Sequence, residues 1–170
     1  GNAEQIERFV PQSLRGDLVW CQLFSEPGAG SDLAALSTKA VKVDGGWKLN
    51  GQKVWTSMAR VADWGICLAR TDVDAPKHKG LSYFLIDIKN TEGLDIRPLR
   101  EITGEALFNE VFFDDVFVPD ECLVGEPGDG WKLARTTLSN ERVSLSHDST
   151  FGAGGEALLA LVENAPGGPD

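Results

Sequence analysis

The 170-residue sequence has only three cysteines, and no two of them are closely spaced. Cys21, Cys67 and Cys122 are odd in number and form no CxxC pattern, which argues against a disulfide framework and against a zinc site. We therefore expect the three thiols to belong to the hydrophobic core, and we expect no metal site.

Long apolar runs and an excess of basic residues are also lacking. No stretch approaches the roughly 18 apolar residues of a membrane span, and the opening GNAEQIERFVPQSL lacks the basic-then-apolar order of a signal peptide. With 26 acidic and 16 basic residues, the net charge of −10 disfavours nucleic acid or an anionic membrane as a partner. A phosphorylated ligand stays compatible, because backbone N–H groups and one arginine can hold it locally. These features predict a cytosolic globular protein.

The chain begins with a helical pattern. Apolar residues between positions 3 and 14 recur at helical spacing, namely Ile6, Phe9, Val10 and Leu14. Pro11 is expected to break or kink this run, because proline lacks the N–H that a helix interior requires. We interpret residues 1–16 as the tail of a helical segment.

Residues 17–126 have the pattern of a β domain. Short apolar or alternating runs, separated by turn residues, predict seven or eight strands. No helical pattern of about 10 residues lies between them, which disfavours a parallel βαβ sheet and predicts a compact antiparallel barrel or sandwich. Asn50-Gly51 predicts a hairpin turn, because type I′ turns need positive φ at both central residues.

A second helical pattern begins near Gly130, after EPGDG. Its apolar stripe contains Trp131, Ala134, Leu138 and Leu145. A lone amphipathic helix cannot bury such a stripe without other helices, in this chain or in another. The sequence thus predicts an α+β chain, with a helical tail, a complete β domain at 17–126 and one or two helices within 127–170, which resembles the middle of a larger protein.

The stretch FSEPGAGSD, from Phe24 to Asp32, follows a predicted strand and has two interpretations. In the first it is a tight glycine-rich loop, in which Pro27 fixes the exit from the strand and Ser31 or Asp32 caps a short turn. It is not the GxGxxG of a nucleotide-binding helix, because no helical pattern follows.

In the second interpretation the same loop is a ligand site. Gly28 and Gly30 would expose backbone N–H groups to a planar or anionic ligand, while the hydroxyls of Ser25 and Ser31 reach its polar edge. The stretch VWTS, residues 54–57, is a second candidate, because it places Trp55 beside two hydroxyl side chains at a strand end. Trp55 is compatible both with a core position and with the wall of a cofactor site.

Together these stretches carry a family resemblance. The order CQLFSEPGAGSD, LNGQKVWTS, FNEVFFDDVFVP, then a glycine and a helix containing NER, resembles the acyl-CoA dehydrogenase family from about Asn2 to the end of the chain. The stretches CQLFSEPGAGSDLA and GEALFNEVFFDDVFVP look most like actinobacterial members that act on bulky or branched acyl-CoA thioesters, some of them as heteromeric complexes. The resemblance implies an incomplete acyl-CoA dehydrogenase fold, with an antiparallel, β-barrel-like middle domain flanked by helices.

The resemblance also implies a domain division and a cofactor. Residues 1–16 would end an N-terminal helical domain, 17–126 would form the flavin- and acyl-CoA-binding β domain, and 127–170 would begin a C-terminal helical domain. FAD would lie between the last two and oxidise acyl-CoA to the trans-2-enoyl thioester, as an oxidoreductase of fatty-acid or lipid metabolism. Electrons would pass to an electron-transfer flavoprotein, and a homo- or hetero-oligomer is expected.

By the same resemblance, positions for cofactor contacts can be assigned. Ser25 would hydrogen-bond the flavin ring, Trp55 would pack near it, and Ser57 would face N5. Such donors stabilise the negative charge that accumulates on reduced flavin. Ser31 would also contact the phosphopantetheine region of CoA. The implied cofactor set is Gln22, Phe24, Ser25, Gly30, Ser31, Trp55, Thr56 and Ser57.

The catalytic base has two placements in the family. Most members carry their glutamate late in the C-terminal domain, beyond this sequence, whereas a minority carries it on the first helix of that domain, directly before an arginine. Here that position is Glu141, followed by Arg142; with Ser139, Arg142 matches positions that touch CoA or brace the site. The alternative is that Glu141 is a solvated helix residue.

Three functions remain open from the sequence. The first is a flavin-dependent acyl-CoA dehydrogenase. The second is an oxidase or monooxygenase on the same scaffold, in which reduced flavin reacts with oxygen. The third is a non-catalytic partner subunit that supports a neighbouring catalytic chain. Fold resemblance alone does not decide among them.

Overall fold

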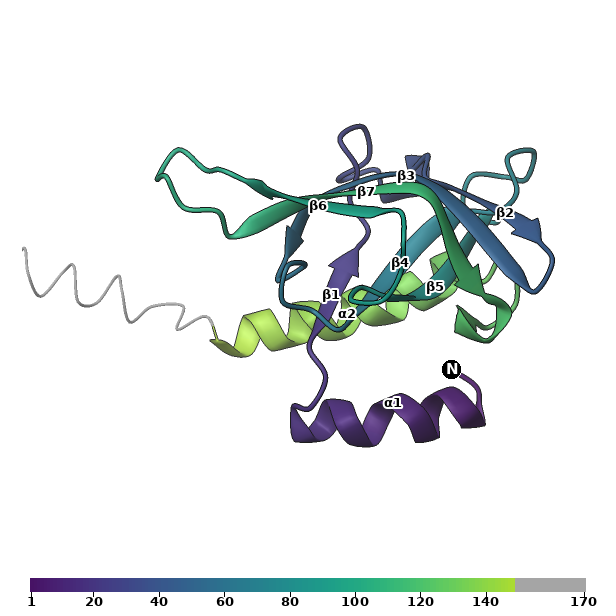
Figure 1. The fold of residues 1–170 in the computed structure, drawn as a ribbon, viewed down its shortest axis with the longest axis horizontal. Coiled ribbons are helices and arrows are strands. Elements are labelled where there is room, and N and C mark those ends of the chain that lie inside the picture. Colours follow the sequence, from purple (N-terminus) through teal and green to yellow (C-terminus); the bar gives the residue numbers. More distant parts are fainter. Residues whose placement is uncertain (149–170) are drawn as a thin grey trace, which may run out of the picture. The chain divides into compact units, whose positions relative to one another are not determined.

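The computed structural model describes residues 1–148 (Figure 1). The described helices are α1 (Ala3–Arg15) and α2 (Gly130–Asp148), with two short 3₁₀ turns, η1 (Leu33–Ala35) and η2 (Asp120–Cys122). The strands are β1 (Trp20–Leu23), β2 (Lys39–Val43), β3 (Gly46–Ser57), β4 (Trp64–Arg70), β5 (Leu81–Asp87), β6 (Leu94–Leu99), β7 (Phe108–Pro119) and β8 (Leu123–Val124). The chain divides into two compact units, Gly1–Ala134 and a second that begins at Arg135.

The strands form one open, mostly antiparallel sheet. Its order is β6-β7-β3-β2-β4-β5-β8, and β1 pairs with β4. The β1–β4 ladder and the Lys39–Arg70 pair between β2 and β4 are parallel. The predicted α+β class, the antiparallel pairing and the number of strands are confirmed for the described residues. The sheet does not close into a barrel.

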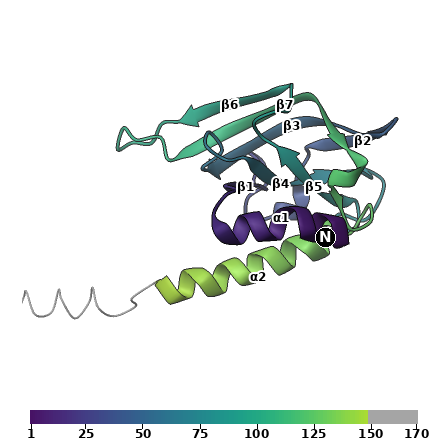
Figure 2. The same cartoon turned by 60° about the horizontal axis from the view of Figure 1, so that its bottom comes forward.

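Helix α1 is fixed to the sheet by one aromatic and one amide side chain. The ring of Phe9 lies 5.4 Å from that of Trp20 and 4.8 Å from that of Trp64, both edge-on. The side chain of Gln5 donates hydrogen bonds to the carbonyls of Glu121 and Leu123. Figure 2 shows α1 beside β1, β4 and β5. Burying an aromatic ring of this size stabilises the contact by about 1.5–3 kcal/mol.

Pro11 does not end α1, contrary to the expectation that it would break the run. The helix continues to Arg15, where Gly16 adopts a left-handed conformation and its N–H bonds to the carbonyls of Gln12 and Ser13. The turns before the proline are held by the buried Gln5, which also forms a reciprocal capping box with Asn2. Tertiary anchoring on one side and a glycine cap on the other offset the hydrogen bond that Pro11 removes.

The predicted hairpin at Asn50-Gly51 is wrong, because both residues lie inside β3. The turn between β2 and β3 is formed by Asp44 and Gly45, and Gly45 has φ +71°. Gly51 serves a different purpose: a Cβ at this position would lie 2.4 Å from the hydroxyl of Thr38 and 2.7 Å from its Cα. Glycine is therefore required at position 51 by close approach of two segments, which an Asn-Gly pair does not distinguish from a turn.

The three cysteines are buried and free, in agreement with the prediction of core thiols. Burial raises the pKa of the Cys21 thiol to about 12 and that of the Cys67 thiol to about 11. Neither helix in residues 1–148 is long and apolar enough to span a membrane.

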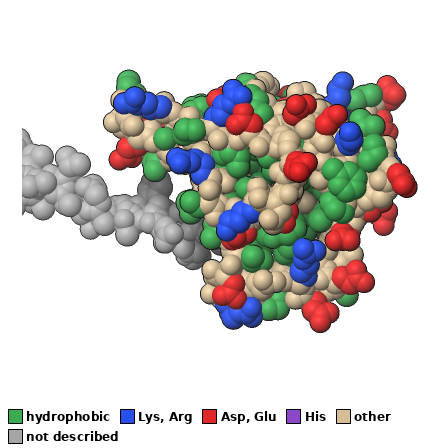
Figure 3. Space-filling model, in the orientation of Figure 1, with side chains coloured by type: hydrophobic (Ala, Val, Ile, Leu, Met, Phe, Trp, Pro, Cys, Tyr) green, Lys and Arg blue, Asp and Glu red, His purple; other side chains and the backbone are tan. Residues whose placement is uncertain are grey.

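The surface drawn in Figure 3 mixes charges of both signs. On this face of the described residues, acidic and basic side chains are scattered among apolar ones, without a continuous basic patch. This distribution agrees with the excess of acidic residues in the sequence.

Candidate functional site

The predicted cofactor residues of the first motif lie at the end of β1 and in the loop that follows it. Gln22 is half-buried in β1, and Phe24 is buried with its ring 5.8 Å from that of Tyr83. Ser25 is half-buried, whereas Gly30 and Ser31 are exposed. The segment thus runs from the core to the surface within ten residues.

A small hairpin forms the glycine-rich part of this loop. Glu26 and Ala29 exchange two backbone hydrogen bonds of 3.0 Å, which turns the chain over Pro27 and Gly28. A Cβ added at Gly28 or Gly30 would have no atom within 4 Å. The loop therefore leaves open space above its backbone, as a site for a flat ligand requires.

The second motif lies on a β-bulge of β3. Opposite β7, Lys53 pairs with Val111 but Thr56 pairs with Asn109, so β3 has one extra residue at this point. Trp55 occupies the bulge with φ +60° and is 58% exposed. Its ring makes an edge contact with Phe108 at 5.8 Å.

The bulge determines which side chains face outward. Before the bulge, the buried side chains have odd residue numbers: Trp47, Leu49 and Lys53. After it, the buried side chain of Thr56 has an even one. Because side chains alternate along a strand, one extra residue exchanges the two faces. Trp55 is exposed for this reason, although a regular strand would bury it.

Thr56 and Ser57 end the strand differently. Ser57 is exposed, whereas Thr56 is buried, and its hydroxyl has no hydrogen-bond partner among the described residues. The buried Asn109 donates from its side-chain amide to the Thr56 carbonyl at 2.9 Å. Asn109 thus braces the bulge from the neighbouring strand.

A buried ion pair joins the two motifs. Lys53 Nζ lies 2.8 Å from Glu26 Oε1, and the two side chains are 0% and 4% exposed. Burial alone would raise the pKa of Glu26, but the charge and hydrogen bond of Lys53, with hydrogen bonds from Ser37 and Thr38, lower it to about 2. Glu26 is therefore ionised at neutral pH.

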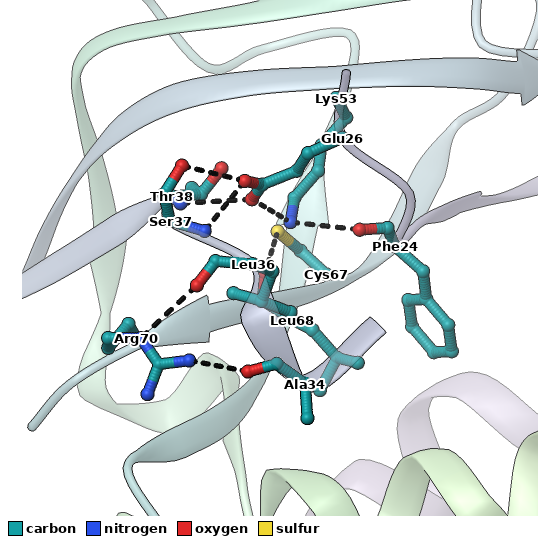
Figure 4. Close-up of polar contacts among 10 residues, drawn as sticks. All are labelled: Phe24, Glu26, Ala34, Leu36, Ser37, Thr38, Lys53, Cys67, Leu68 and Arg70. Carbon is teal, nitrogen blue, oxygen red and sulfur yellow. Dashed lines mark hydrogen bonds and ion pairs between the residues drawn. The ribbon is translucent and has the colours of Figure 1, made fainter. Parts of the chain in front are cut away.

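Arg70 provides a second attachment for the loop. Its guanidinium donates to the carbonyl of Ala34 at 2.7 Å and to that of Leu36 at 3.1 Å. Figure 4 shows Arg70 bonded to Ala34 and Leu36, and Glu26 bonded to Lys53, Ser37 and Thr38. At the surface, Lys77 also forms an ion pair with Asp32.

Three site-forming residues were not predicted from the sequence: Glu26, Lys53 and Arg70. The sequence did contain an indication that Lys53 is buried. Its residue number is odd, like those of the inward-facing Trp47 and Leu49 in β3, so alternation places the three side chains on one face. A lysine at a core-facing position requires a buried partner. The sequence does not reveal that the partner is Glu26, because 26 residues of chain separate the two.

The structure brings the two motifs together. The backbone N–H of Val54 donates to the Ser25 carbonyl at 2.9 Å, so the residue before Trp55 is bonded to the middle of the first motif. A separate cavity of about 450 Å³, lined in part by Arg8, Trp64 and Phe117, contains none of the predicted site residues.

The residues predicted on α2 belong to the second unit. Ser139 is exposed and its hydroxyl donates to the Arg135 carbonyl one turn earlier. Glu141 is exposed, and the side chain of Arg142 lies outside the described residues. Their roles therefore stay predictions, as do the roles of the cofactor residues.

Comparison with known proteins gives a consistent family. Residues 21–116 match the model of the acyl-CoA dehydrogenase middle domain. The chain is 66% identical over 162 residues to acyl-CoA dehydrogenase FadE34 of Mycobacterium tuberculosis, an alignment that covers 95% of this chain and 23% of that protein. The chain thus spans about a quarter of the length of this curated relative.

Two solved structures show the same likeness. The Tcur3481-Tcur3483 steroid ACAD superposes with a TM-score of 0.80 at 39% identity, covering 85% of this chain and 37% of that one. The FAD complex of PigA superposes with a TM-score of 0.74 at 29% identity, covering 81% and 36%. By its middle-domain match and its relatives, this chain belongs to the acyl-CoA dehydrogenase family.

Proposed function

We propose that this chain contains the flavin- and thioester-binding part of an FAD-dependent dehydrogenase that converts an acyl-CoA into its trans-2-enoyl thioester. The observation that carries the proposal is the bond between Val54 N–H and the Ser25 carbonyl, which sets an exposed tryptophan beside an open glycine loop. Members of the family bind FAD, and the two motifs supply what a flavin requires.

The chemistry of these residues fits a flavin. An isoalloxazine has an apolar ring system and a polar pyrimidine edge, and when bound it accepts a hydride from the β carbon of the thioester. The exposed Trp55 ring offers an apolar cover. The Ser25 hydroxyl and the backbone N–H groups near Gly30 offer donors for the polar edge.

In this proposal the remaining predicted residues keep their assigned positions. Gln22 and Phe24 would lie on the loop side of the flavin, Ser57 would face N5, and Ser31 would contact both the cofactor and the phosphopantetheine of CoA. Each lies in a segment that the structure describes, with Ser31 and Ser57 exposed to solvent. Exposure makes them accessible to a ligand.

For the chemical step, the carboxylate of Glu141 removes the α proton of the thioester. Arg142 and Ser139 bind or brace the CoA portion, since a guanidinium suits a phosphate. Glu141 is exposed on α2, as contact with a substrate requires.

The proposed substrate is a bulky or branched acyl-CoA, and the proposed assembly is a hetero-oligomer. The support is the likeness to a steroid ACAD whose name pairs two components. An electron-transfer flavoprotein is the proposed electron acceptor. A cytoplasmic location fits these partners.

A spectroscopic experiment tests the function. The protein, purified with the partner that copurifies with it, is titrated anaerobically with acyl-CoA thioesters of increasing bulk while its visible spectrum is recorded. We expect flavin bands that bleach with a bulky thioester and recover when electron-transfer flavoprotein is added. Rapid recovery in air would instead identify an oxidase, and absence of bound FAD would overturn the proposal.

The variant Glu141→Gln separates catalysis from support. A general base contributes about 10²-fold or more, so we expect bleaching at least on the order of 10²-fold slower, with FAD binding unchanged. Asn140→Gln, which changes the neighbouring residue on the same exposed helix segment, is the matched control. If Glu141→Gln bleaches at the normal rate, either the base lies elsewhere or the chain is a non-catalytic partner subunit.

A further inference from the structure

Lys53 is fully buried, and its ammonium group binds two parts of the first motif. Nζ donates to the Phe24 carbonyl at 3.1 Å and to Glu26 Oε1 at 2.8 Å. Ser25 lies between these two acceptors in the chain. One side chain thereby holds the backbone of the residue before, and the carboxylate of the residue after, the serine that the proposed function places against the flavin ring (Figure 4).

Glu26 extends this attachment to the far end of the loop. Its carboxylate accepts hydrogen bonds from the Ser37 N–H at 2.6 Å, the Ser37 hydroxyl at 2.9 Å and the Thr38 N–H at 2.9 Å. The loop therefore leaves and re-enters the sheet at the same carboxylate. The residues between, including Gly30 and Ser31, project from this fixed base.

The covalent neighbours of Lys53 form the second proposed flavin contact. Val54 follows it and bonds to the Ser25 carbonyl, and Trp55 comes next on the bulge. Lys53 also pairs with Val111 as the last regular pair before the bulge. The distance between Ser25 and Trp55 thus depends on where the Lys53 ammonium group holds the loop.

An apolar pair at these positions would not perform the same task. Removing the two charged groups would leave the Phe24 carbonyl without the Lys53 ammonium, and the N–H groups of Ser37 and Thr38 without their carboxylate. Buried ion pairs often contribute little net stability, yet they impose one geometry because an unpaired buried charge is costly. The arrangement is suited to fixing a position more than to raising stability.

We propose that Lys53, through Glu26 and the Phe24 carbonyl, is a positioning residue that sets the loop of Ser25 and the bulge of Trp55 at the separation that the flavin requires. This inference rests on the proposed function. In this inference, a buried lysine that does not touch FAD controls the affinity of the protein for FAD.

The test separates position from stability with three variants of the full chain. Lys53→Met removes the ammonium group, Glu26→Gln removes the carboxylate charge, and Lys53→Met/Glu26→Gln removes both charges while the amide oxygen can keep the hydrogen bonds that Glu26 Oε2 accepts from Ser37. FAD affinity is measured by fluorescence titration, and unfolding of the FAD-free protein by urea. Lys42→Met, which breaks an exposed ion pair with Asp120, is the control.

The double variant gives the decisive result. We expect it to unfold nearer to the wild-type urea concentration than either single variant, because no unpaired charge remains buried. Its FAD affinity should nonetheless stay lower on the order of tenfold or more, since a displaced contact group loses binding energy steeply with position. Lys42→Met should leave both quantities unchanged.

Other outcomes separate this inference from the proposed function. If the wild type binds FAD and the double variant binds it equally well, the positioning role is overturned and the proposed function stands. If FAD affinity simply follows stability across the three variants, the pair is structural and the inference fails. A wild type that binds no FAD overturns the proposed function and the inference with it.

Discussion

The ladder between β3 and β7 contains two irregularities that look alike and differ in use. Near Leu49 and Gly51 the extra residue lies on β7, and Asp115 has φ +49°. Between Lys53 and Thr56 the extra residue lies on β3, and Trp55 has φ +60°. The first shifts the register by one residue and the second restores it.

The two positions are stabilised in different ways. The Asp115 N–H donates to the Asn50 side chain, and the Asn50 amide donates back to the Asp115 carboxylate. Aspartate also tolerates the left-handed region better than most residues. Tryptophan does not share this tolerance. At the second bulge, the carbonyl of the next residue, Thr56, accepts a hydrogen bond from the side chain of Asn109 on β7. Backbone strain at an exposed aromatic residue is typical of sites that bind ligands. At the first bulge, by contrast, the polar groups of Asp115 are hydrogen-bonded to Asn50.

The largest expected effect concerns the close approach beside the first bulge. In Gly51→Val, the new Cβ would meet the backbone and hydroxyl of Thr38. We expect a loss of about 3 kcal/mol or more in unfolding free energy, measured by urea denaturation, because backbone atoms cannot move aside. Gly28→Ala, which adds a Cβ in open space, should change it by less than about 0.5 kcal/mol. Equal effects would show that the approach to Thr38 is not tight.

The pH dependence of stability tests the ion pair between Lys53 and Glu26. The pKa of Glu26 falls from 4.5 to about 2 on folding, so its contribution is complete above pH 4.5 and is lost as the pH falls through about 2. We expect the unfolding free energy to decrease by up to about 3 kcal/mol in this window from Glu26 alone. Glu26→Gln should show a flatter profile between pH 4.5 and 2. An unchanged profile would contradict the ionised pair.

The brace of the second bulge is expected to matter less. Asn109→Ala removes the donor to the buried Thr56 carbonyl, which costs about 1–2 kcal/mol in unfolding free energy. The same change should weaken FAD binding, because the bulge orients Trp55. Asn90→Ala, which removes exposed hydrogen bonds to Asp87, is the comparison and should leave FAD binding intact. If both variants bind FAD like the wild type, Asn109 does not orient the bulge.

The smallest effect compares strain at Trp55 and Asp115, the positive-φ residues of the two bulges. Trp55→Gly should be more stable than Trp55→Ala by about 1 kcal/mol, because glycine adopts φ +60° without a Cβ clash. At Asp115, both replacements lose the carboxylate that accepts from the Asn50 amide and keep the backbone N–H bond to Asn50, and the Gly variant should regain a similar amount over Ala. Thermal unfolding of all four variants measures these differences. A more stable Trp55→Ala would mean that the left-handed conformation is not strained.

Much of the fold could be predicted from residue patterns. Seven or eight strands and a helix from near Gly130 were predicted from periodicity and turn residues, because these are local properties of the chain. The hairpin at Asn50-Gly51 was predicted wrongly, since an Asn-Gly pair fits a turn and a close approach equally well. Whether a segment such as Thr38 lies against Gly51 is a long-range fact that no local pattern contains.

The candidate site shows the same division. The two motifs and their order were visible in the sequence, and so was the chemistry of serine, glycine and tryptophan at a strand end. Lys53 escaped notice because a lysine in an alternating strand is ordinarily solvated. Its role became visible when the fold placed Glu26 at 2.8 Å from it.

The amino-acid order therefore settled which segments are strands, where the loop with Ser25 lies, and which family the motifs resemble, because these depend on neighbours along the chain. Tertiary structure decided the rest. Pairing of β3 with β7 created the two bulges, and the second one turned Trp55 outward and Thr56 inward. The face that a strand residue presents depends on register with a distant partner, and a single extra residue exchanges the two faces.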